Sequence, residues 1–75
     1  MTNNEVIKLA EKQIIVYESL DMKKTVNYKA WTTLKIALEI INKTYDIVYD
    51  RYRIDENKIR ELQDLLEGAT NIWED

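Results

Sequence analysis

The fold of this chain is decided by residues 31–52, which read WTTLKIALEIINKTYDIVYDRY. Apolar side chains recur there in alternating steps of three and four residues, at Trp31, Leu34, Leu38, Ile41, Tyr45, Val48 and Tyr52. That spacing is typical of one face of an α-helix. A second apolar set lies off this face, at Ile36, Ala37, Ile40, Ile47 and Ile54. A helix that is apolar on more than one side predicts a middle element with neighbours on either side.

Working outward from this helix, the sequence predicts an all-α fold, a short helical bundle formed by a single domain over residues 1–75. The chain has one Gly and no Pro, which argues against an all-β fold, because such folds need turn residues every ~8–12 positions. The expected helices cover about residues 3–20, about residues 27–53 and about residues 55–67.

Capping residues set these limits. Thr2 and Glu5 form a capping box in front of the first helix. Thr25 or Asn27 is expected to cap the second helix. Gly68 is expected to end the third helix, because glycine adopts the left-handed C-cap conformation at little cost.

The second and third helices are also compatible with one continuous long helix. The spacing of three and four continues beyond residue 52 at Asp55, Ile59, Leu62 and Leu66. Asp55 favours a break at residues 54–56, because an unpaired carboxylate on an apolar seam costs several kcal/mol. As an N-cap the same side chain is favourable. The sequence leaves both arrangements open.

The composition argues against several kinds of chemistry. Without Cys or His, the chain lacks a thiol nucleophile, a zinc–thiolate site and the commonest general base. A single Gly is too few for the Gly-rich loops that hold nucleotide phosphates. We therefore expect a protein that is not an enzyme and holds neither a metal nor a cofactor. The formal net charge of −3 argues against direct nucleic-acid binding.

The sequence also predicts a cytoplasmic location and no membrane partner. The N-terminal residues carry no basic leader, and no apolar run is long enough to span a bilayer. The small size and the abundance of Lys, Asn and Ile resemble the products of accessory genes in phages and mobile elements.

Self-association is a further expectation. Hydrophobic residues make up 45% of the chain, more than a helical domain of 75 residues covers easily by itself. We expect a homo-oligomer, a dimer or higher, since most soluble oligomers are built from identical chains. Ile72 and Trp73, in the C-terminal tail, are expected either to fold back onto the domain or to dock onto another copy.

Candidate binding residues cluster near the end of the second helix. Three Tyr and two Arg residues lie within residues 45–53, and these residue types dominate interface hot spots. Tyr45 and Tyr52 share the main apolar face and are expected to pack against the domain with their hydroxyl groups at its rim, whereas Tyr49 is expected to face outward. The binding residues predicted from this pattern are Tyr49, Arg51, Tyr52, Arg53 and, in the tail, Trp73.

Two functions fit these observations. The first is a non-enzymatic, acidic helical protein that acts by protein–protein interaction, such as an accessory regulator or inhibitor of a host factor. The alternative is sequestration of a small anionic ligand, such as a nucleotide, at subunit interfaces. There, repeated copies of Tyr49, Arg51 and Arg53 would supply aromatic faces and guanidinium groups.

Overall fold

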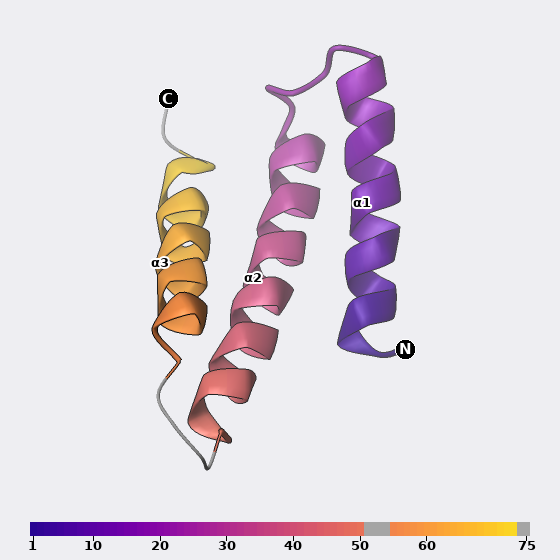
Figure 1. Cartoon of the computed structure of the whole chain (residues 1–75). Helices are drawn as coiled ribbons and strands as arrows, with labels where there is room; N and C mark the ends of the chain where they lie inside the picture. Colours follow the sequence, from indigo (N-terminus) through magenta and orange to yellow (C-terminus); the bar gives the residue numbers. More distant parts are fainter. Residues whose placement is uncertain (51–54, 74–75) are drawn as a thin grey trace.

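The computed structural model describes residues 1–50 and 55–73, and within these ranges it contains three α-helices and no strand (Figure 1). The helices are α1 (Asn3–Ser19), α2 (Val26–Val48) and α3 (Glu56–Asn71). The prediction of an all-α bundle is confirmed, and α1 agrees closely with the predicted first helix.

Threonine side chains begin the first two helices. The hydroxyl oxygen of Thr2 accepts a hydrogen bond from the Glu5 amide at 3.2 Å, as the capping box predicts. The hydroxyl oxygen of Thr25 accepts from the Tyr28 amide, also at 3.2 Å. Thr25 is therefore the N-cap among the two candidates, and α2 begins at Val26.

The end of α1 is closed by a Schellman motif. The Met22 amide donates to the Tyr17 carbonyl at 2.8 Å, and the Asp21 amide donates to the Glu18 carbonyl at 3.1 Å. This geometry requires a left-handed residue, and Asp21 supplies it with φ of 55°. Aspartate tolerates that conformation better than most side chains, but less well than glycine.

The chain breaks between α2 and α3, so the alternative of one continuous helix is wrong. The Asp55 carboxylate accepts a hydrogen bond from the Asn57 amide at 3.0 Å and caps α3, a bond that is closed to it in a helix interior, where that amide bonds to the carbonyl four residues earlier. α2 ends at Val48, earlier than the predicted residue 53. The Asp50 carboxylate lies 3.9 Å from the Lys58 ammonium group, whereas these two residues would be ~12 Å apart along the axis of one continuous helix.

The prediction that Gly68 ends the third helix is also wrong. α3 continues to Asn71, and Gly68 lies within it without a positive φ. Its role is packing rather than capping. A Cβ atom at this position would lie 3.1 Å from Cδ1 of Ile36 on α2, so the missing side chain lets the two helices approach closely.

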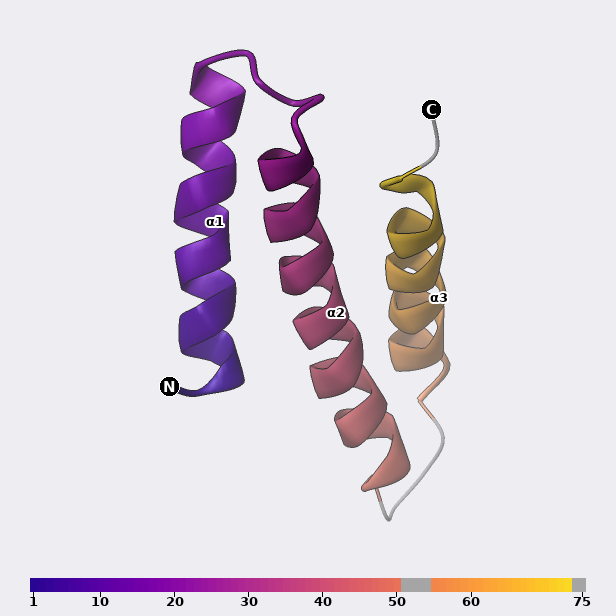
Figure 2. The same ribbon diagram turned by 180° about the vertical axis from the view of Figure 1, so that it is seen from behind.

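The three helices form one layer. α2 lies between α1 and α3 and contacts both, whereas the described residues of α1 and α3 make no contact with each other (Figures 1 and 2). The molecule extends 45 × 30 × 15 Å, so its thinnest dimension is close to that of a single helix, ~10–12 Å across with side chains. The prediction that this helix is the middle element is confirmed.

A layer of this kind has almost no core. Ala10, on the α1–α2 junction, is the one hydrophobic residue that is fully buried within the described part of the chain. The radius of gyration is 14.0 Å, whereas a compact domain of this length has a radius of ~11 Å. Domains ordinarily bury an apolar core between two layers of secondary structure, and here one layer stands alone.

Candidate interaction surface

One face of α2 is apolar and open to solvent. Leu34, Ile41, Tyr45 and Val48 follow one another in steps of seven, four and three residues, which places them on one side of the helix. Their exposed fractions are 38%, 54%, 62% and 66%. These residues belong to the stripe that the spacing predicts as the packed face, so the prediction that Tyr45 packs against the domain is wrong.

The opposite face of the layer is polar and is marked by ion pairs. The Lys35 ammonium group on α2 lies 3.9 Å from a Glu11 oxygen on α1 and 3.7 Å from a Glu39 oxygen on α2. The Lys43 ammonium group donates to the Glu61 carboxylate on α3. This hydrogen bond, opposed by partial burial of the amine, raises the pKa of Lys43.

These ion pairs also show which sides of α1 and α3 belong to the apolar face. At ~100° per residue, the exposed side chains Leu9, Val16 and Leu20 lie roughly 140–180° around α1 from Glu11. Leu66 on α3 lies about 140° around its helix from Glu61. All three helices thus contribute to one surface, which we call the apolar face: Leu9, Val16, Leu20, Leu34, Ile41, Tyr45, Val48 and Leu66.

Ile15 is an exposed apolar residue that does not belong to the apolar face. It is 63% exposed, yet it lies one helical turn from Glu11 and therefore belongs to the polar side of α1. A single exposed isoleucine is common on protein surfaces, whereas a contiguous apolar surface over three helices is typical of interaction sites.

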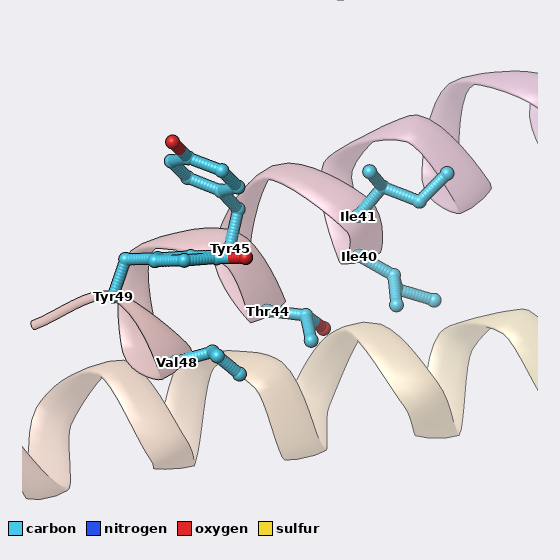
Figure 3. Close-up of a pocket in the computed structure, with 6 residues that line it drawn as sticks. All are labelled: Ile40, Ile41, Thr44, Tyr45, Val48 and Tyr49. Carbon is cyan, nitrogen blue, oxygen red and sulfur yellow. The ribbon is translucent and has the colours of Figure 1, made fainter.

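The apolar face contains an open groove near the end of α2 (Figure 3). It has a volume of about 330 Å³ and is lined by Ile40, Ile41, Thr44, Tyr45, Val48 and Tyr49. The rings of Tyr45 and Tyr49 meet with centroids 4.5 Å apart and planes tilted by 33°. The lining is almost entirely carbon and carries no charged group, so it fits apolar side chains of a protein partner better than an anion.

The predicted binding residues are divided by this structure. Tyr49 is the C-cap of α2, is exposed as predicted, and borders the groove. Arg51, Tyr52 and Arg53 lie outside the described residues, so the ligand site predicted around them stays a prediction.

Trp73 lies at the other end of the molecule from Tyr49. Its indole Nε1 donates to the Thr33 hydroxyl oxygen at 2.8 Å, near the start of α2. The Lys29 ammonium group lies 5.7 Å from the centre of the indole ring, within the range of a cation–π contact. Trp73 therefore folds back onto its own chain, one of the two arrangements expected for the tail, while about half of it stays exposed.

The residues that sequence reasoning missed are the exposed members of the main apolar stripe. Their spacing is the same whether a face is covered by the chain itself or by a partner, so periodicity alone does not separate the two cases. One feature of the sequence does indicate that part of α2 stays uncovered, and it is the second apolar set on the same helix. With only two neighbouring helices, α2 has more apolar sides than the chain covers.

The described residues offer little for other kinds of site. They contain no group of three or more acidic, His or Cys side chains placed to hold a metal ion. None of the helices described here is both long and apolar enough to cross a membrane.

In the comparisons with known proteins, no family model, curated protein or solved structure matches this chain.

Proposed function

We propose that this protein is a non-enzymatic interaction protein that works by packing its apolar face against helices of another protein. The observation that carries the proposal is the open apolar face itself, which extends over three helices and lacks charged side chains on α2. Helix-to-groove packing of this kind is a recurrent mode of protein recognition. This mode fits an accessory regulator or inhibitor that acts in the cytoplasm by occupying a surface of a host factor.

Tyr45 and Ile41 are the residues that we expect to anchor such a contact. Both border the groove, and both are more than half exposed. Aromatic side chains bury a large area at small entropic cost, which is why they are enriched at the centre of interfaces. The rings of Tyr45 and Tyr49 already contact each other in the free chain, so each loses less freedom when a partner packs on them.

Photo-crosslinking in cells tests this proposal. A benzophenone side chain replaces Tyr45 in one variant and Ile15, on the polar side, in the matched control. We expect irradiation to link position 45, but not position 15, to a protein other than a second copy of this chain. Products containing only this chain at position 45, or the same foreign product from both positions, would contradict the proposal.

A further inference from the structure

We infer that the resting occupant of the apolar face is a second copy of this chain, so that two layers pack face to face into a six-helix bundle. This inference rests on the proposed function, because it names an occupant for the same face. A foreign partner would then act by displacing the second copy. Three observations support a second copy.

The first observation is the exposed area. The chain exposes 5984 Å², whereas a folded monomer of 9.0 kDa is expected to expose about 4,900 Å². The excess is roughly 1,100 Å² per chain, and burying it on two chains removes roughly 2,200 Å². Obligate homodimers bury ~2,000 Å² or more, so one partner layer of the same size accounts for the whole excess.

The second observation is the distribution of charge. The chain has a net charge of −3, so two copies repel each other when their charged sides meet. On α2 the apolar face consists of uncharged residues, and the ion pairs of Lys35 and Lys43 lie on the opposite side. Face-to-face packing therefore brings two acidic chains together with their charges directed to solvent. A basic partner has no complementary charge to meet on this face.

The third observation is the missing core. With Ala10 as the one fully buried hydrophobic residue among those described, the layer has too little buried apolar surface to offset the conformational entropy of folding. A cover must therefore be present whenever the chain folds. A second copy is made at the same time and in the same amount, so it meets this requirement without any other protein.

Sedimentation equilibrium of the purified full-length chain at micromolar concentration tests the inference. We expect twice the chain mass of 9.0 kDa for the wild type. Ile41→Lys places a charge in the centre of the apolar face and should lose both the dimer and its helical structure, because the uncovered layer does not stay folded. Ile15→Lys makes the same substitution on the polar side, where the new ammonium group faces Glu11 one turn away, and should stay dimeric.

Cysteine labelling assigns the face, because the chain contains no Cys of its own. Ile41→Cys should react with a maleimide at least ~10-fold more slowly than Ile15→Cys, since it is accessible only in the dissociated fraction. A wild-type chain that is fully helical by circular dichroism yet has the mass of one copy would overturn the inference. So would a dimer in which both thiols react equally fast. A folded monomer that still crosslinks a foreign protein through position 45 would leave the proposed function standing.

Discussion

Ile15 and Ile41 are the same residue type and are similarly exposed, at 63% and 54%, but they stand on opposite faces of one helical layer. One turn from Ile15 lies Glu11, whose carboxylate pairs with the Lys35 ammonium group at 3.9 Å. Around Ile41, the neighbours are Tyr45 and other residues of the largely apolar groove. Exposed fraction alone therefore does not distinguish the two faces, whereas the chemistry of the surrounding side chains does.

The largest expected effect is the difference in stability between the two isoleucine truncations. Ile41→Ala should lower the free energy of unfolding by about 2–4 kcal/mol, as expected for a core isoleucine, if a second layer covers it. Ile15→Ala should change it by less than ~0.5 kcal/mol, because the side chain stays in water. Urea unfolding at one fixed chain concentration measures both. Equal and small losses would remove the distinction between the two faces.

The sequence predicts where the helices begin better than it predicts which side chains of α2 stay exposed. The caps at Thr2, Thr25 and Asp55 are local, so each could be derived from a few neighbouring residues. The role of Gly68 could not, because it depends on Ile36, more than thirty positions away in the chain. The same holds for the candidate surface. The spacing predicts that Tyr49 faces outward, but the exposure of Tyr45 depends on how many helices the chain has available to cover α2.

The turn between α1 and α2 offers a way to change the stability of the layer without touching either face. Asp21 adopts a left-handed conformation that costs a residue with a Cβ atom ~1–2 kcal/mol. Asp21→Gly should therefore raise the free energy of unfolding by about 1 kcal/mol, partly offset by the greater flexibility of glycine in the unfolded chain. The gain should be the same in the wild-type and Ile41→Ala backgrounds, because the two sites are distant. Urea unfolding of the four chains gives this result, and a loss of stability would contradict the Schellman geometry.

Gly68 tests the α2–α3 junction, where two effects oppose each other. Alanine at this position gains ~1 kcal/mol of helix propensity over glycine, but its Cβ meets Cδ1 of Ile36 at 3.1 Å. Because Cδ1 is the end of a flexible side chain, we expect Gly68→Ala to gain only a fraction of that amount. Ile36→Val removes the opposing methyl group. In that background Gly68→Ala should recover most of ~1 kcal/mol, and thermal unfolding of the double-mutant cycle measures the coupling. Equal effects in both backgrounds would show that the contact does not limit the approach of the helices.

The smallest effect is expected on the polar face, at the Lys43–Glu61 ion pair. The Glu61 hydrogen bond raises the pKa of Lys43 above its ordinary value of 10.5, so protonated Lys43 stabilises the folded chain. This contribution is fully present below pH 10.5 and is lost as the pH rises through the higher pKa of the folded state. Since Glu61 is largely exposed, we expect it to be worth less than ~1 kcal/mol and to weaken with salt.

The measurement that isolates this pair is the difference in thermal midpoint between the wild type and Lys43→Met from pH 8 to pH 11.5. Other groups that titrate over this range are common to both chains, so the difference should stay constant to about pH 10 and shrink above it. Lys12→Met is the control, because the structure shows no ion pair for Lys12 among the described residues. A difference that shrinks between pH 8 and pH 9 instead would assign the effect to another group. If Lys43→Met lowered the thermal midpoint at pH 8 by more than Ile41→Ala does, the order of the two faces would be reversed. The polar face would then contribute more to stability than the apolar one.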